Sequence, residues 1–485
     1  MTNSQVDYLI RNAYVITMDA NRNVFVDGYV AVDKGKIVSV GIDAECNLIA
    51  KKTINGKGKA VMPGLVNAHN HINQMLLRSS IDDRSSYVPN ITGFMQKMVD
   101  IWSNATPDLC YKIVRLHLMD MMLGGITAVH DQHFTNYPNT NIDGTLEAIK
   151  ESNLRAFVSR CHLSAESLPE QARENVQDVL KEVERLKSIW DNNFITITGS
   201  PINPTWVKTP EELIELREGI RDMNVPFDID LSGASWKQTL VERGYTKGGA
   251  VKYCAELGIL DQDVSGGKSF MLEPDEYDIW KETGMTACIV PLGRIRDELG
   301  PSTHHFLARD IVPGLGNDGP MGTPQSSIWQ VMRHTYIADI VRKKAETLQG
   351  YTEDHHIELS PEILLEMATL GGQKHLFLGN DVGGLETDKF ADLIMVDINN
   401  HRFYPHNNLR RIPTHLVFST DVQDVELVMI QGKIVVEDKR STIWDYEIVK
   451  NEAEAATQEL LKMAGYESML PSRTPGSSFN GWNYK

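Results

Sequence analysis

The stretch VMPGLVNAHNHINQMLLR, residues 61–78, decides the fold. An apolar run ends at His69 and His71, and a segment with apolar residues at helical spacing follows. Residues i and i+2 of a β-strand point to the same face, so the two imidazoles can be aimed at one point. Convergent imidazoles are typical of a metal site, whereas an isolated pair is more often two surface histidines. The rest of the chain must decide between these interpretations.

Length and composition narrow the class of protein. The chain has 485 residues, of which 41% are hydrophobic and 23% charged, which suits a large α/β barrel with a smaller accessory domain. No membrane span or export signal is evident, so we expect a cytoplasmic protein with no membrane partner. The net charge of -17 repels polyanions, which argues against a nucleic-acid partner. The five cysteines are widely spaced and odd in number, which predicts packing thiols in a reducing compartment.

Residues 61–379 alternate short β-like runs with helical ones. Eight strand-then-helix units in a row predict an α/β fold, a closed (β/α)8 TIM-type barrel, whose chemistry lies at the carboxyl ends of the strands. His69, His71 and Asp318 all fall at such ends.

The two ends of the chain read differently. Residues 1–60 and 380–440 are β-rich, and we expect them to form one small β-sandwich domain together. Residues 441–485 are expected to be a helix, at about 445–465, followed by a tail rich in Pro, Gly and Ser.

Six motifs occur in an order that resembles a known family. They are PGLVNAHNHINQMLLR, GITAVHDQ, LGNDG, LEMATLGGQKHLFLG, GGLETDKFADLIMVD and VELVMIQGKIVVED. They resemble the signatures of the amidohydrolase superfamily, most closely its branch of s-triazine chlorohydrolases and barrel-type deaminases. The resemblance implies a (β/α)8 barrel with a β-sandwich built from both termini, and one divalent metal ion. Zinc is the first expectation for that ion, with iron, manganese or cobalt as alternatives.

The resemblance carries over only part of the family's metal site. His69, His71 and Asp318 match the ligands of strands 1 and 8. At the strand 5 histidine this chain has Asp230, in DIDLSG, and at the strand 6 histidine it has Lys268. Gly233 stands where the family has a proton-shuttling glutamate. No histidine lies between His162 and His304, so shifting the alignment restores neither ligand.

Three roles remain open for the altered pair. Asp230 is expected as a replacement ligand, which gives a harder set of two imidazoles and two carboxylates. Alternatively, Asp230 and Lys268 form a buried ion pair in the space that two histidines vacate. In the third case Lys268 has a lowered pKa and acts as base or nucleophile. Asp318 can serve as the catalytic base in each case.

Further polar residues are expected around the site. The candidates for contact with substrate are Gln74, Arg78, His130, His133 and His162. His304 and His305 are expected on a loop, with solvent-facing positions favoured.

The resemblance implies a hydrolase of a carbon–nitrogen or carbon–halogen bond in a small nitrogen-rich or heterocyclic compound. We expect an enzyme that forms a homo-oligomer and acts on a small-molecule substrate, not on peptide bonds. Two alternatives stay open. One is a metal-poor barrel enzyme that eliminates, isomerises or cleaves through Asp318 and Lys268, and the other is a non-catalytic descendant. Because Gly233 offers no carboxylate, cytosine and guanine are expected to be poor substrates.

Overall fold

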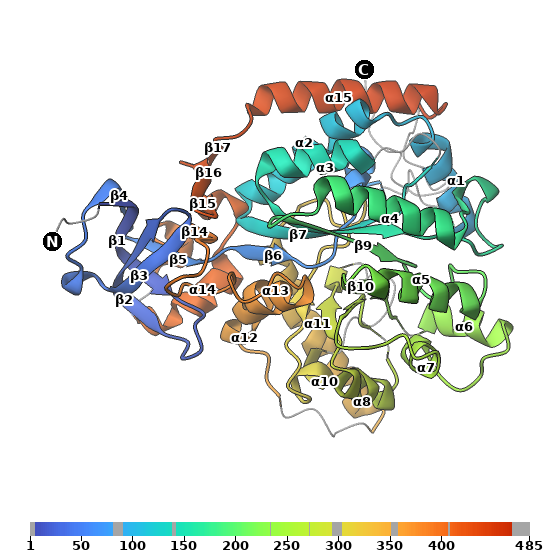
Figure 1. The fold of residues 1–485 in the computed structure, drawn as a ribbon. Coiled ribbons are helices and arrows are strands. Elements are labelled where there is room, and N and C mark those ends of the chain that lie inside the picture. The colour runs from blue at the N-terminus through green and yellow to red at the C-terminus, as the bar shows by residue number, and fades with distance from the viewer. Residues whose placement is uncertain are drawn as a thin grey trace, which may run out of the picture.

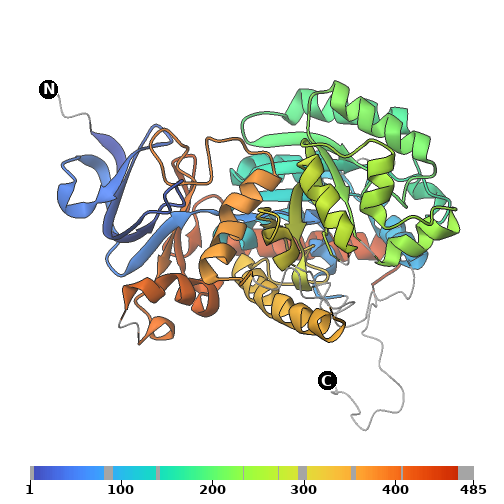
Figure 2. The ribbon, with the colours of Figure 1, turned by 90° about the horizontal axis from the view of Figure 1, so that it is seen from below.

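The computed structural model describes residues 5–80, 91–137, 142–232, 234–270, 272–292, 303–350, 357–405 and 408–467. Gly233 therefore lies outside the described residues. A broad sheet lies at one side of the molecule, next to a larger body of strands covered by helices (Figures 1 and 2).

The larger body contains two four-stranded parallel sheets. The first is ordered β6 (Leu65–Asn67), β7 (Ile126–His133), β8 (Arg155–Cys161) and β9 (Ile195–Ser200). The second is ordered β10 (Phe227–Asp230), β11 (Val264–Gly267), β12 (Thr286–Ile289) and β13 (Gly314–Leu315). The sheets adjoin at both edges, where β9 contacts β10 and β13 contacts β6. The predicted α/β class with parallel strands is confirmed.

Helices follow the parallel strands and cover them. They are α1 (Ile91–Trp102), α2 (Pro107–Leu123), α3 (Ile142–Ser152), α4 (Val176–Trp190), α5 (Pro210–Asp222), α6 (Ala234–Glu242), α7 (Ala250–Glu256), α8 (Pro274–Thr283), α10 (Thr303–Leu307), α11 (Ile328–Leu348), α12 (Pro361–Glu366) and α13 (Gly372–His375). Local sequence fixes where several begin. Thr106 accepts a hydrogen bond from the Leu109 amide, and Pro107 is the first residue of α2. Every residue of β7 and β8 is buried, as expected for strands covered on both faces.

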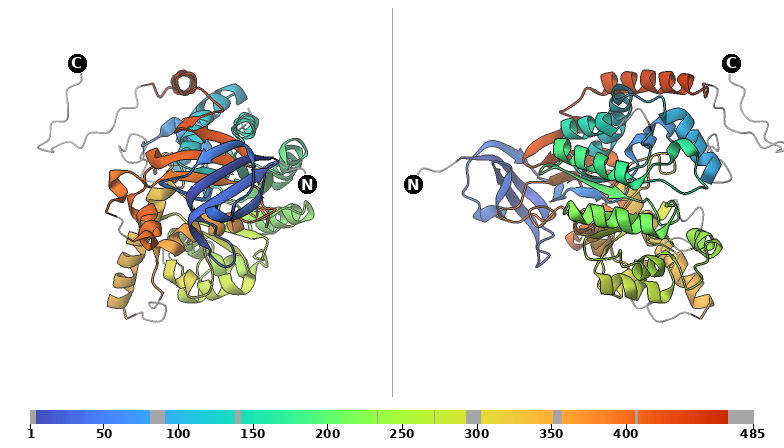
Figure 3. Two further views of the ribbon diagram at one scale, coloured as in Figure 1. Left: turned by 90° about the vertical axis from the view of Figure 1, so that its left-hand side faces the viewer. Right: turned by 45° about the vertical axis from the view of Figure 1, so that its right-hand side comes forward.

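Strands from both ends of the chain share the other sheet. Its order is β17 (Arg440–Ser441), β16 (Lys433–Glu437), β15 (Val425–Ile430), β14 (Leu393–Asp397), β5 (Lys59–Pro63), β1 (Val6–Ile16), β2 (Val24–Asp33) and β3 (Lys36–Ile42), and β4 (Ala50–Asn55) pairs with β1. Figure 3 shows the blue N-terminal and red C-terminal strands side by side. Val61 of β5 lies opposite Met395 of β14 in antiparallel register. Only Gly64 separates β5 from β6, so this sheet leads directly into the strand before His69.

Two helices complete the C-terminal part. They are α14 (Ile412–Ser419) and α15 (Tyr446–Met463). The second agrees with the predicted last helix and lies along α2 on the outside of the larger body (Figure 1). The five cysteines are free and buried, so the predicted packing role is confirmed. None of the helices within the described residues is long and apolar enough to cross a membrane.

Candidate metal centre and catalytic site

The structure brings together three of the residues that the sequence singled out. The Nε2 atoms of His69 and His71 lie 3.4 and 3.5 Å from Oδ1 of Asp318. One donor atom from each residue lies within 4.8 Å of the other two. The three donors thus converge where β6 and β13 end, side by side.

Backbone contacts set this convergence. The Asp318 amide donates to the carbonyl of His69 at 3.1 Å, and the Ala68 amide donates to that of Leu315 at 2.8 Å. A Cβ at Gly316 would lie only 2.7 Å from the His69 backbone nitrogen, so glycine is needed for this close approach.

Three asparagine side chains, which we call the amide clamp, hold the two segments together and were not predicted from the sequence. Oδ1 of Asn317 accepts hydrogen bonds from the side-chain amides of Asn67 at 2.8 Å and Asn70 at 2.6 Å. All three asparagines are buried. Asn317 directly precedes Asp318, so the clamp fixes the backbone position from which the Asp318 side chain extends. The only signal in the sequence was the position of these amides beside the predicted ligands.

Lys268 lies between two carboxylates. Its Nζ is 2.9 Å from Oδ1 of Asp318 and 3.3 Å from Oδ2 of Asp230. Asp230 is fully buried, and its Oδ1 lies 3.7 Å from Nδ1 of His69. The ion pair between Asp230 and Lys268, one of the open roles, is therefore present. Asp230 belongs to neither of the two groups of donor atoms that lie within 4.8 Å of one another among the described residues.

A second polar layer lies behind these residues. The Gln132 side-chain amide donates to Oδ2 of Asp228 at 3.1 Å and to Oδ1 of Asp230 at 3.3 Å. His130 lies 3.4 Å from Oδ2 of Asp228 and 3.0 Å from the hydroxyl of Ser159. Burial lowers the pKa of His130, but the nearby carboxylates, Asp228 foremost, together outweigh this effect, so the pKa is raised overall. His130 is fully buried and held by protein groups.

Two other substrate-contact candidates are occupied by protein partners. Arg78 pairs with Asp120 at 2.8 Å and donates to the carbonyl of Pro324 at 2.7 Å. His133 lies 3.1 Å from Oδ2 of Asp131, whose other oxygen accepts from the Ile72 amide. Arg78 is thus joined to α2, and Asp131 of β7 joins His133 to the segment after His71.

Gln74 and His162 are placed differently. A Cβ on Gly319, the residue after Asp318, would lie 2.5 Å from Oε1 of Gln74, so this amide borders the site. His162 is fully buried, 3.7 Å from Glu212, and burial lowers its pKa to about 4. His162 is therefore a neutral ring near physiological pH.

The donor set fits a divalent cation. Nδ1 of His71 lies 2.7 Å from the carbonyl of Gln132, which can only accept, so Nδ1 carries the proton and Nε2 presents an electron pair. Burial also lowers the pKa of His69, which keeps that ring neutral. Among the described residues, neither nitrogen of His69 has a hydrogen-bond partner. Oδ1 of Asp318 faces the Lys268 ammonium at 2.9 Å. Donors bound tetrahedrally at about 2.0–2.1 Å are separated by roughly 3.4 Å. The distances from Oδ1 of Asp318 to Nε2 of His69 and Nε2 of His71, 3.4 and 3.5 Å, match this value.

The expectation that His304 and His305 face solvent was wrong. His304 is fully buried on α10, with Nδ1 2.8 Å from Asp339 and Nε2 2.9 Å from Glu346 of α11. His305 lies 3.1 Å from the same Glu346 oxygen. Each nitrogen of the His304 ring has a carboxylate partner, and such pairing allows the histidine to be buried.

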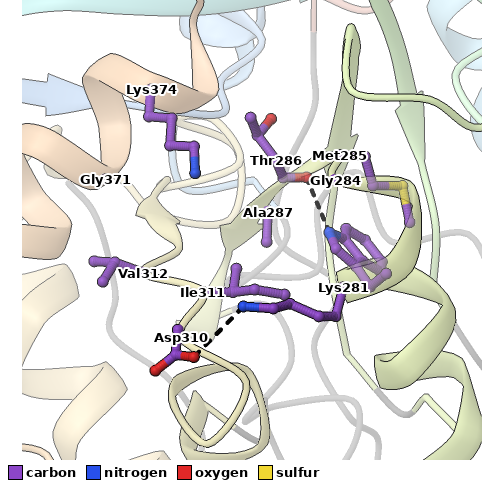
Figure 4. Close-up of a pocket in the computed structure, with 11 residues that line it drawn as sticks. Lys281, Gly284, Met285, Thr286, Ala287, Asp310, Ile311, Val312, Gly371 and Lys374 are labelled. Carbon is purple, nitrogen blue, oxygen red and sulfur yellow. Dashed lines mark hydrogen bonds and ion pairs between the residues drawn. The ribbon is translucent and has the colours of Figure 1, made fainter.

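A cavity of about 170 Å³, drawn in Figure 4, has none of these residues in its lining. It is lined by Trp280, Lys281, Gly284, Met285, Thr286, Ala287, Asp310, Ile311, Val312, Gly371 and Lys374. Thr286 is the first residue of β12, so the cavity lies at the amino ends of the parallel strands. In barrel enzymes that end serves stability, and the reacting groups lie at the other.

A comparison of the chain with models of known protein families agrees with the order of the motifs and the spacing of the donor atoms. The model of the Amidohydrolase family matches residues 60–435 of this chain. The chain belongs to the amidohydrolase family. The match confirms the predicted family, and with it the expectation of a hydrolase that acts on carbon–nitrogen bonds.

Relatives of this amidohydrolase match it over nearly its whole length. The 5'-deoxyadenosine deaminase of Methanosarcina mazei is 28% identical over 462 residues, which are 94% of this chain and 98% of the relative. The 5-methylthioadenosine/S-adenosylhomocysteine deaminase of Thermoanaerobacter pseudethanolicus is 24% identical over 463 residues, which are 94% of this chain and 100% of the relative.

Solved structures share the fold of this amidohydrolase. Atrazine chlorohydrolase from Arthrobacter aurescens, complexed with zinc, superimposes with a TM-score of 0.81 at 21% identity, covering 93% of this chain and 100% of that one. An adenosine deaminase from Xanthomonas campestris with bound zinc gives 0.82 at 20% identity, covering 94% and 99%.

Proposed function

We propose that this chain is a hydrolase with one divalent metal ion that acts on a small nitrogen-rich heterocycle, replacing a ring amino group with oxygen from water. The observation that carries the proposal is the convergence of one donor atom each from His69, His71 and Asp318. The names of the relatives, deaminases of adenine nucleosides, support this substrate class. Zinc is the first ion to test, with iron, manganese and cobalt as alternatives.

We also propose that the two parallel sheets are halves of one closed (β/α)8 barrel over residues 61–379. The contacts of β9 with β10 and of β13 with β6 support closure. On this proposal residues 1–60 and 380–440 form the accessory domain, and 441–485 a helix and tail. The site residues follow β6, β10, β11 and β13 or end them, so they share the catalytic end of the barrel.

His69, His71 and Asp318 would hold the ion. When bound, such an ion lowers the pKa of a water molecule toward neutrality and polarises the substrate. The carboxylates around the site favour a cation here, because Asp228, Asp230 and Asp318 outnumber the ammonium of Lys268 and the one charge that His130 carries when protonated.

The chain's own residues can move the protons. The side chain of Asp318 is 26% exposed, whereas those of His69 and Asp230 are fully buried, so Asp318 meets the substrate side and accepts a proton from the attacking water. The Lys268 ammonium, 2.9 Å away, donates a proton to the leaving nitrogen. The carbon–nitrogen bond breaks, ammonia leaves, and Asp318 returns its proton to Lys268. This pair would take over part of the work of the glutamate that the family has at position 233.

A second candidate function is favoured by the same ion pair. Lys268 already places a positive charge against Oδ1 of Asp318, the oxygen that faces both imidazoles. A metal-poor enzyme could use this pair for elimination, isomerisation or cleavage. Contact of substrate with Gln74, Arg78, His130, His133 and His162 stays a prediction, as does a homo-oligomer.

The test uses purified full-length protein grown with added zinc. Ammonia release is measured with 5'-deoxyadenosine, 5-methylthioadenosine, S-adenosylhomocysteine and adenosine, and chloride release with a chlorinated s-triazine. We expect turnover of at least one compound, its loss together with the metal in His71→Ala, and normal turnover in His401→Ala, whose histidine is exposed. Turnover that survives in a metal-free His71→Ala protein would favour the second candidate.

A further inference from the structure

Asp230 stands at the back of a metal-binding histidine. Its Oδ1 lies 3.7 Å from Nδ1 of His69, while Nε2 of the same ring faces Asp318 at 3.4 Å. The two carboxylates therefore lie on opposite sides of one imidazole. We propose that Asp230 is a positioning residue that accepts the Nδ1 proton of His69, and not a fourth ligand. This inference rests on the proposed function.

The neighbouring imidazole shows the same arrangement. Nδ1 of His71 donates to the carbonyl of Gln132 at 2.7 Å, which leaves Nε2 free to face Asp318. Metal-binding histidines commonly donate their second nitrogen to a carbonyl or carboxylate, which fixes the tautomer and raises the basicity of the ligand. Asp230 gives His69 what the Gln132 carbonyl gives His71. A shift of less than 1 Å brings the 3.7 Å separation into hydrogen-bond range.

The surroundings of Asp230 keep its carboxylate in that place. Gln132 donates to Oδ1 at 3.3 Å, and Lys268 pairs with Oδ2 at 3.3 Å. Both oxygens of Asp230 thus have a polar neighbour in addition to His69. A Cβ at Gly267 would collide with Oδ1 of Asp230, so the glycine leaves room for this contact. The Lys268 charge offsets a carboxylate that is fully buried.

The donor set itself has no place for Asp230. The three atoms that lie within 4.8 Å of one another come from His69, His71 and Asp318. An aspartate side chain is shorter than the histidine that the family has at this position. The Asp230 carboxylate therefore ends beside Nδ1 of His69, and it is Nε2 of His69 that faces Asp318.

A cysteine in place of each aspartate reports whether the position touches the ion. Wild type, Asp230→Cys and Asp318→Cys are loaded with cobalt(II), and their near-ultraviolet spectra are compared. A thiolate bound to cobalt gives a charge-transfer band, and thiolates are good ligands for such ions. We expect the band in Asp318→Cys and none in Asp230→Cys. A band in Asp230→Cys would overturn the assignment.

Metal affinity tests the positioning role separately. Zinc affinity is measured by chelator competition for Asp230→Asn, Asp230→Ala and the control Asp228→Asn. Asp228 lies two residues earlier on the same strand and is equally buried, but it faces His130. We expect affinity to fall by about 10–100-fold in Asp230→Ala, less in Asp230→Asn, and least in the control. Equal losses at 228 and 230 would contradict the role.

The two proposals fail in distinguishable ways. If wild-type protein binds neither cobalt nor zinc, the proposed function fails and the positioning role falls with it. If wild type binds the metal but Asp230→Cys gives the band, only the positioning role fails.

Discussion

Lys268 and Asp318 form an ion pair at 2.9 Å although both have left-handed backbone, with φ of 46° and 70°. A non-glycine residue in this region costs on the order of 1–3 kcal/mol and persists only where surrounding contacts hold it. Here the Asn317 clamp and the bond from the Asp318 amide to His69 hold one partner. Strain of this kind gathers at functional sites, which agrees with a catalytic role for the pair.

Removing one member of the buried pair Lys268–Asp230 should destabilise the metal-free protein. Lys268→Met or Asp230→Asn leaves the other partner with less compensation, so each should lower the free energy of unfolding by about 3 kcal/mol. The double variant should cost much less than the sum. Urea denaturation of the metal-free wild type, the two single variants and the double variant measures the four free energies of unfolding. Lys51→Met, which breaks an exposed pair with Asp7, is the control and should change little. Additive losses would show that the two side chains act independently.

Gly316→Ala should disrupt the site through the backbone. The new Cβ would lie 2.7 Å from the backbone nitrogen of His69, so the histidine must move. We expect a loss of zinc affinity of at least about tenfold, since displaced ligands bind weakly. Gly124→Ala is the control, because its Cβ would meet only ordinary contacts at 3.4 Å or more. Equal zinc affinity in the two variants would mean that the strand-end contact does not position His69.

The His304 cluster should make stability depend on pH. Burial lowers the pKa of His304, but hydrogen bonds with Asp339 and Glu346 together outweigh burial. The pKa is therefore raised above its usual value. The stabilisation is therefore complete below about pH 6.5 and is lost as the pH rises through the folded-state pKa. His305, Arg342 and Lys343 also face these carboxylates.

We accordingly expect His304→Gln to lower the melting temperature more at pH 6 than at pH 9. Thermal unfolding of wild type and variant at both values measures the difference. His401→Gln, at an exposed histidine, should show no such dependence. A difference that grows with rising pH would contradict the assignment of a charged imidazolium.

The missing carboxylate at Gly233 should show in substrate choice. Cytosine and guanine are expected to be turned over poorly, because no glutamate is available at the usual shuttle position. Ammonia release from each base is the measurement. Rates typical of a dedicated enzyme, on the order of 10 per second, would show that another group replaces the glutamate fully.

Local patterns made the parallel strands and three donors predictable. Buried parallel strands are continuous apolar runs, and the residues that end them must gather at one edge. Spacing thus placed His69, His71 and Asp318 at the ends of strands, and the family resemblance indicated that they form one ligand set. The ion pair between Asp230 and Lys268 was one of the roles left open, because a sequence does not show how far a side chain reaches.

Contacts between distant segments were not predictable. The Asn317 clamp joins residues about 250 positions apart. His304 is buried because its carboxylate partners lie 35 and 42 residues later on α11. Arg78 follows the histidine motif, yet it pairs with Asp120 of α2. In each case the partner is fixed by packing and leaves no local mark.

The metal content of wild-type protein tests the central claim most directly. Protein grown with zinc, manganese, iron and cobalt is purified without chelators and analysed for all four elements, with folding checked by circular dichroism. We predict about one equivalent of divalent metal per chain, because a site with three converging donor atoms retains its ion. Less than about a tenth of an equivalent in well-folded protein would contradict the account.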